Sequence, residues 1–97
     1  MDSSIVKQIE KRRRQMLVSR VLYYCWDSPM IDDHLYDKWN RELETLEQRY
    51  PQESQVAKYF EISPSKTVGS DDLFDYPIEI VRTAEMLRDY KGKRGQE

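Results

Sequence analysis

The fold is decided by residues 21–51, which read VLYYCWDSPMIDDHLYDKWNRELETLEQRYP. Pro29 disfavours helical geometry at Ser28, the residue before it. The run DSPMID around this proline combines Asp, Ser and Pro, which is the composition of a turn. The sequence therefore predicts that a first helix stops near Trp26 and that the chain reverses before a second helix begins.

The second helix is predicted at about 33–50. Asp32 or Asp33 would be its N-cap, because aspartate is among the preferred residues at that position, and Pro51 would end the helix. Apolar residues at helical spacing predict the face that this helix buries, namely Leu35, Trp39, Leu43, Leu46 and Tyr50.

The first helix is predicted at about 3–26, with Ser3 or Ser4 as its N-cap. Arg13 and Arg20 interrupt its apolar stripe, so their aliphatic stems should lie along a narrow buried strip with the charged heads in water. Because only a short loop joins the two helices, we expect an antiparallel helical hairpin. The stripe itself consists of Ile5, Ile9, Met16 and Tyr23.

The C-terminal half predicts less regular structure, followed by a third helix. Residues 54–61 would form a short helix, whereas 62–70, ISPSKTVGS, has the Ser, Pro and Gly content of an irregular segment. Pro77 suits the first position of a helix at about 77–90, and Gly92 would terminate it. The expected architecture is all-α, with one helical domain at 1–90 and a flexible tail at 91–97.

Size and charge exclude several classes of protein. The chain has 97 residues, of which 38% are hydrophobic and 35% charged. A domain of this size buries a thin core, which excludes a barrel or a doubly wound sheet around a deep catalytic cavity. The net charge of -2 provides no overall basic field for nucleic acid. The run Lys11–Arg14 would spread around a helix and is interpreted as a solvated basic patch, so DNA is not expected to be the primary partner.

The single cysteine and the single histidine exclude an internal disulfide and a zinc cluster of the usual composition. Cys25 is interpreted as a small packed residue and His34 as a surface residue in the first turn of the second helix. The N-terminus lacks the apolar core of a signal peptide, and no apolar run approaches the length of a membrane span. We expect a cytoplasmic protein.

Tyrosines and aspartates cluster at the predicted tip of the hairpin. Asp33, Tyr36 and Asp37 share one side of the second helix through offsets of three and four, and the loop brings them toward Tyr23 and Tyr24. We expect an outward-facing set of phenol rings and carboxylates. A tyrosine face attracts a cation, and carboxylates accept hydrogen bonds from hydroxyl or amide groups. An oxidised nicotinamide ring with its ribose would suit this set, as would a methylated amine or an arginine of a partner protein; alone, Asp33 would be interpreted as an N-cap.

Two motifs in this region resemble a known family. The pattern Y-Y-x-x-D-x-P-x-I-x-D-x-x-Y-D begins at Tyr23, and the segment SPSKTVG occupies residues 63–69. In this order they are similar to the N-terminal domain (domain Ia) of bacterial NAD-dependent DNA ligases. The resemblance covers roughly residues 17–69.

The resemblance implies recognition of the nicotinamide mononucleotide (NMN) half of NAD. By position, Tyr23, Asp33, Tyr36 and Asp37 match residues that contact NMN in the family. Tyr24 stands where many members have histidine, so the phosphate end of the site lacks the positive charge of an imidazolium. No lysine of this chain lies in the K-x-D-G motif of the family's nucleotidyltransferase domain, so the chain is not expected to ligate DNA by itself.

Two functions remain open from the sequence. The chain would be an NMN/NAD-recognition module that acts in trans with a separate nucleotidyltransferase subunit of a ligase. Alternatively, it would be a non-catalytic interaction protein, such as a phage or mobile-element decoy or inhibitor, that binds a host ligase or another NAD-using protein. A third possibility is a piece cut from a longer ligase, against which the charged ending GKRGQE weighs.

Overall fold

Helices make up all of the regular structure in the computed structural model, which describes residues 1–95. The all-α class is therefore confirmed. The main elements are α1 (Ser3–Arg20), which continues into a short π-helix η1 (Val21–Cys25), then α2 (Asp33–Arg49), α3 (Pro51–Val56), the 3-10 turn η2 (Leu73–Asp75) and α4 (Ile78–Gly95).

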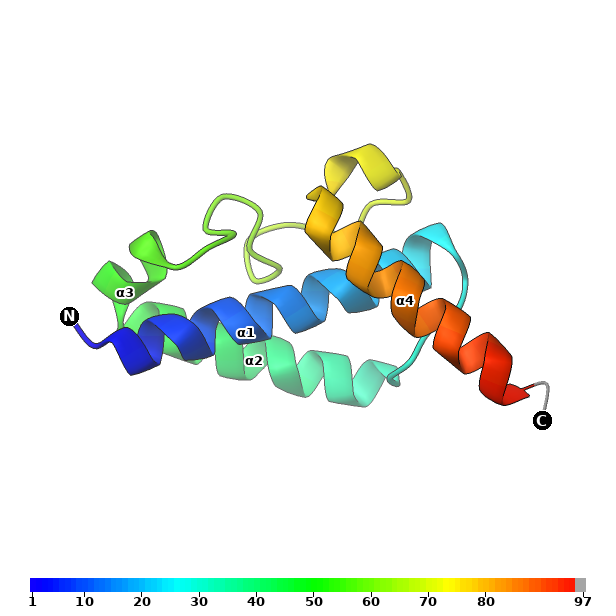
Figure 1. Cartoon of the computed structure of the whole chain (residues 1–97). Coiled ribbons are helices and arrows are strands. Elements are labelled where there is room, and N and C mark those ends of the chain that lie inside the picture. Colours follow the sequence, from blue (N-terminus) through cyan, green and yellow to red (C-terminus); the bar gives the residue numbers. More distant parts are fainter. Residues whose placement is uncertain (96–97) are drawn as a thin grey trace.

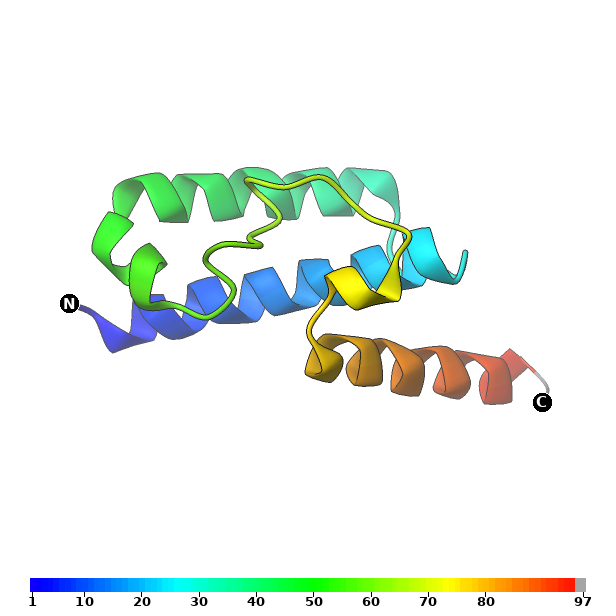
Figure 2. The same cartoon turned by 90° about the horizontal axis from the view of Figure 1, so that it is seen from above.

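The first two helices form the predicted antiparallel hairpin (Figure 1). In Figure 2, α1 and α2 lie side by side, and the irregular segment 57–72 runs along the hairpin that they form. Helix α4 packs against the C-terminal half of α1 and projects beyond the tip of the hairpin. The end of the first helix and the start of the second thus form the tip of the hairpin, and α4 lies beside it.

The helix caps match the sequence prediction at α2 and differ from it at α1. Asp32 is the N-cap of α2 and accepts a hydrogen bond of 2.8 Å from the Leu35 N–H. At α1 the cap is Asp2, which accepts from the Ser4 N–H, and not Ser3 or Ser4. Aspartate is as good a cap as serine, and its use here starts the helix at Ser3.

Two apolar clusters hold the helices together. One lies between α1 and α2 and includes Ile9, Met16 and Leu43. The other lies between the end of the first helix and α4 and includes Leu22 and Ile80. Of the predicted face of α2, only Leu43 is fully buried, and the remaining four residues are half-buried.

The charged heads of two arginines lie in the interior, contrary to the prediction that they reach water. Arg13 has no exposed surface. Its guanidinium donates to the Glu47 carboxylate at 2.5 Å, to the Ser54 hydroxyl at 2.7 Å and to the carbonyls of Ser54, Ala57 and Lys58. A buried guanidinium is tolerated when its donors are paired, and segments far along the chain supply these acceptors. Arg13 therefore joins α1, α2 and α3.

The basic run is only partly a solvated patch. Arg12 lies against the Trp39 ring, with the guanidinium carbon 4.8 Å from the ring centroid, and pairs with Glu42 at 3.3 Å. Together with the burial of Arg13, this leaves Lys11 and Arg14 as the exposed members of the run.

Two helix boundaries differ from the prediction. The short helix after α2 is α3, Pro51–Val56, so it begins three residues earlier than expected; Pro51 both ends α2 and opens α3, as suits a first helical position. Helix α4 continues to Gly95, past Gly92, which does not terminate it. The last two residues of the predicted flexible tail lie outside the described residues.

No helix in the described part of the chain combines the length and apolar character that crossing a membrane requires.

We expect Arg13→Ala to lower the free energy of unfolding by about 3–5 kcal/mol, because it leaves the buried Glu47 charge and several carbonyls without their donor. Urea denaturation followed by far-UV circular dichroism measures this loss. The matched control is Arg14→Ala, which removes the neighbouring exposed arginine and should change stability by less than about 0.5 kcal/mol. Equal losses in the two variants would contradict the structural role of Arg13.

The Glu47 carboxyl should make stability depend on pH. Burial by itself would raise the pKa of Glu47, but hydrogen bonds from Ser65, Arg13 and Ser63 outweigh it and hold this pKa below its usual value. A lowered pKa in the folded state contributes stability above the unfolded pKa of about 4.3 and loses it as pH falls through the folded pKa. We therefore expect the stability advantage of the wild type over Glu47→Gln to shrink below about pH 5. Parallel stability curves for the two proteins in acid would refute this.

Candidate functional site

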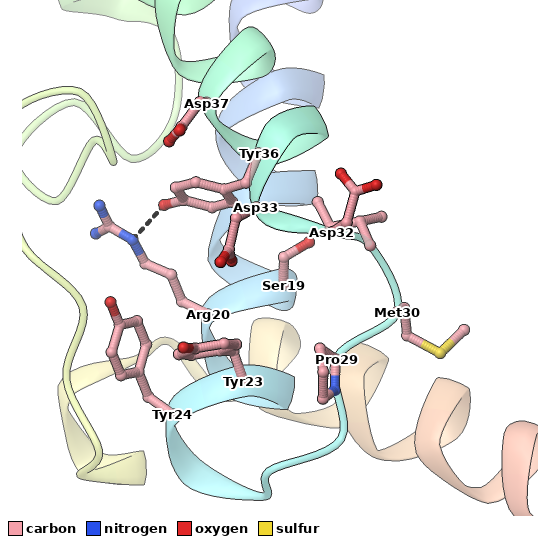
Figure 3. A pocket seen from close by; sticks show the side chains of 11 residues that line it. Ser19, Arg20, Tyr23, Tyr24, Pro29, Met30, Asp32, Asp33, Tyr36 and Asp37 are labelled. Atoms are coloured by element: carbon pink, nitrogen blue, oxygen red, sulfur yellow. Dashed lines mark hydrogen bonds between the residues drawn. The ribbon is translucent and has the colours of Figure 1, made fainter.

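A cavity of about 350 Å³ lies at the tip of the hairpin (Figure 3). The end of the first helix, the turn before α2 and the first turns of α2 enclose it. All five candidate residues from the sequence line this one cavity. The full lining consists of Ser19, Arg20, Tyr23, Tyr24, Pro29, Met30, Ile31, Asp32, Asp33, Tyr36 and Asp37.

A change in helix type places two tyrosines at the cavity. Tyr23 and Tyr24 belong to η1, where the α-helical hydrogen-bond pattern gives way to a π-helix. The π-helix is rare in proteins, but where it occurs it is often part of a functional site. Two residues after η1, Asp27 has a φ of 47°, and the Ser28 N–H closes the turn on the Leu22 carbonyl at 2.7 Å. This wide final turn directs the chain into the loop that leads to α2.

The two tyrosine rings form one aromatic wall. Their centroids are 4.9 Å apart and their planes meet at 74°, an edge-to-face arrangement. Tyr23 is 49% exposed and Tyr24 48% exposed. For Tyr23 this corrects its expected place in the buried stripe of the first helix. The wall therefore keeps about half of its aromatic surface available to a ligand.

Tyr24 lies directly on Gly69. A Cβ added to this glycine would be 2.0 Å from the Cε2 atom of the tyrosine ring, far inside contact distance. Only a residue without a side chain permits this approach. Gly69 thus ties the end of the SPSKTVG segment to the cavity, a function for that motif which sequence spacing did not reveal.

The carboxylates come from the start of α2. Asp33 and Asp37 are exposed and lie one helical turn apart, and in Figure 3 the Asp33 carboxylate lies between the rings of Tyr23 and Tyr36. Because Asp32 caps the helix, Asp33 does not perform the capping role considered for it. Its oxygens can accept hydrogen bonds from ligand hydroxyl or amide groups.

Sequence reasoning missed Arg20 as a member of the site. This arginine is only 7% exposed, although its head was expected in water. Its Nε donates to the Tyr36 hydroxyl at 2.6 Å, and its terminal nitrogens donate to Thr67 and to the Pro64 carbonyl. One signal was present, because Arg20 follows Arg13 by seven residues and so repeats its place on the buried face.

The sequence predicted that Tyr36 would face outward, but in the structure its side chain is half-buried. Burial raises the pKa of its phenol, and the neighbouring Arg20 guanidinium opposes that rise without cancelling it. The phenol therefore keeps its proton at neutral pH. It offers a polar group on the floor of the cavity, whereas the exposed rings of Tyr23 and Tyr24 form its wall.

The remaining chemically active side chains do not join the site. The Cys25 Sγ lies 3.7 Å from the Ser70 carbonyl, and burial followed by the charges of Asp71, Asp72 and Asp75 raises its pKa, which disfavours a reactive thiolate. His34 is exposed in the first turn of α2, as expected. Within residues 1–95, no three His, Cys, Asp or Glu side chains are grouped so that they could hold a metal ion.

Comparison with known proteins gives a consistent set of matches. A family model described as the DNA ligase-like, N-terminal NAD+-binding domain matches residues 2–69. A DNA ligase of Brachyspira hyodysenteriae is 31% identical over 88 residues, which cover 86% of this chain and 12% of that protein. A DNA ligase of Coxiella burnetii is 34% identical over 71 residues, which cover 73% of this chain and 10% of that protein. The chain thus spans about a tenth of the length of these relatives. No solved structure matches.

The close packing of Tyr24 on Gly69 can be tested with Gly69→Ala. We expect the added methyl group to displace the Tyr24 ring while the fold stays intact, because the ring is half-exposed and has room to move. The aromatic NMR signals of Tyr24 should shift, and those of Trp39 at the middle of α2 should not. Unchanged Tyr24 signals would show that the ring does not lie on Gly69 in solution.

Proposed function

Because this chain belongs to the family of DNA ligase-like, N-terminal NAD+-binding domains, we propose that its cavity recognises the NMN half of NAD. We further propose that it does so in trans with a separate nucleotidyltransferase subunit. The observation that carries the proposal is that Tyr23, Tyr24, Asp33, Tyr36 and Asp37 all line one cavity.

The lining suits the chemistry of this ligand. The oxidised nicotinamide ring is flat and positively charged, and the face of a tyrosine ring attracts a cation. The half-exposed Tyr23 ring can stack on it, while Asp33 and Asp37 accept hydrogen bonds from the ribose hydroxyls or the amide. The volume of about 350 Å³ is at the lower end of the range for small-molecule sites, roughly 300–1,000 Å³. It is therefore suited to half of a dinucleotide.

In this proposal a partner protein supplies the second half of the site and the groups for the chemistry. Bound NAD would supply an adenylyl group to a lysine, and no K-x-D-G lysine occurs in this sequence. The residues of this chain would bind and orient the nicotinamide end. Because the aromatic wall is half-exposed, a partner that closes over it would exclude water and strengthen binding.

The surface of the C-terminal region supports a protein partner. Phe74 is 97% exposed, and Ile78 and Met86 are also largely exposed. These side chains lie on η2 and α4, which pack beside the hairpin, and α4 projects past its tip (Figure 1). Apolar side chains exposed to this degree would lose contact with water on binding a partner, which favours association.

NMR titration of the full chain with NMN tests ligand recognition. We expect shifts of the backbone signals of the cavity residues, and roughly tenfold or greater weakening in Asp37→Asn, because a hydrogen bond to a charged group contributes about 1.5–3 kcal/mol. Asp89→Asn, which neutralises an exposed aspartate on α4, is the matched control and should bind as the wild type does.

A titration without any shift, alone and with a nucleotidyltransferase partner added, would overturn the proposal. If such a partner binds equally well to the wild type and to a Tyr36→Ala, Asp37→Ala variant without any response to NMN, the interaction-protein alternative is favoured.

A further inference from the structure

The cavity presents a charge problem for a ligand that carries a phosphate. Three carboxylates line it, those of Asp32, Asp33 and Asp37, against one cationic side chain, Arg20. The carboxylates favour the nicotinamide ring and repel the phosphate of NMN. We infer that Arg20 fixes the Tyr36 hydroxyl as a hydrogen-bond donor to the phosphate, so that Arg20 is the positioning residue for the anionic end of the ligand. This inference rests on the proposed function.

The direction of one hydrogen bond carries the argument. The Arg20 Nε–H donates to the Tyr36 oxygen at 2.6 Å. A guanidinium has donors only, so the Tyr36 oxygen must be the acceptor. The single O–H proton of the phenol is then left to donate elsewhere, and Tyr36 lines the cavity. The arginine thus occupies the acceptor side of the Tyr36 hydroxyl, and the O–H proton of this hydroxyl remains available to the ligand.

The arginine is held so that it cannot turn away. Its Nη1 donates to the Thr67 hydroxyl at 2.8 Å, and its Nη2 donates to the carbonyls of Pro64 and Thr67 at 2.9 and 2.7 Å. With 7% of its surface exposed, the guanidinium keeps little water around it. A charge in such surroundings interacts more strongly with a nearby group than it would in bulk water.

The phenol of Tyr36 remains a proton donor beside the guanidinium. Burial raises the pKa of Tyr36 and the guanidinium only partly opposes that rise, so the phenol keeps its proton at neutral pH and can donate it to an anionic oxygen. In Figure 3 the hydroxyl of Tyr24 points toward the same guanidinium. Two phenols beside one buried cation therefore supply the polar surroundings for a phosphate where a histidine cation is absent.

Two ligands that differ only by the phosphate separate this role from general binding: NMN and nicotinamide riboside. We expect the wild type to bind NMN at least fivefold more tightly than the riboside in NMR titrations. Arg20→Gln should weaken NMN binding about tenfold and riboside binding less than twofold, which abolishes the preference. Tyr36→Phe should abolish the same preference, and the double variant should lose no more than either single variant.

Controls distinguish positioning from a loss of folding. Ser54→Ala removes a partner of Arg13 at the opposite end of the hairpin, so it should lower the melting temperature and leave the ratio of the two affinities unchanged. Arg20→Lys keeps the positive charge and should restore part of the preference. If Arg20→Gln does not fold, Thr67→Val, which removes one partner of Arg20, should lower the preference two- to threefold.

The outcomes separate the two proposals. Equal weakening of both ligands in Arg20→Gln would make Arg20 a structural residue only and overturn the inference, while NMN recognition stands. Equal affinities of the wild type for NMN and the riboside would also overturn the inference. If neither ligand shifts the wild-type signals, the proposed function fails, and the inference fails with it.

Discussion

The ion pair between Arg13 and Glu47 is the interaction on which the N-terminal region depends. It joins α1 to α2, and through the carbonyls of 54, 57 and 58 it fixes the chain as it leaves α3. Glu47 then accepts from the hydroxyls of Ser63 and Ser65, so the same carboxylate holds the irregular segment against the hairpin. Replacing a buried ion pair by apolar residues is often neutral or stabilising. We therefore infer that this ion pair mainly determines where the irregular segment lies, and that it adds little to the net free energy of unfolding.

A second buried arginine repeats this arrangement seven residues later. Arg20 holds the next part of the irregular segment through Pro64 and Thr67, and the segment then passes under the Tyr24 ring at Gly69. The two arginines thus fasten a segment without regular hydrogen bonding along the length of the hairpin. Backbone carbonyls that would otherwise be buried without partners become acceptors for guanidinium groups.

The cavity at the tip depends on this fastening. Its aromatic wall comes from the π-helical end of the first helix and its carboxylates from the start of α2, but Tyr36 on its floor is held by Arg20. Two helix ends thus supply the lining, and the irregular segment holds Arg20, which holds Tyr36. In that arrangement the rings of Tyr23 and Tyr24 stay half-exposed.

The sequence by itself determined the hairpin, the turn at DSPMID, an aspartate cap at Asp32 or Asp33 and the clustering of tyrosines and aspartates at one end. These features follow from spacings of three and four residues and from proline, which act within a few positions. Tertiary structure alone decided that Arg13 and Arg20 are buried and that Tyr36 faces inward. The physical reason is that a guanidinium can leave water only when its acceptors are supplied, and here they come from residues 16 to 47 positions away along the chain. The seven-residue spacing of the two arginines marks the buried face, but no local pattern shows where the acceptors come from.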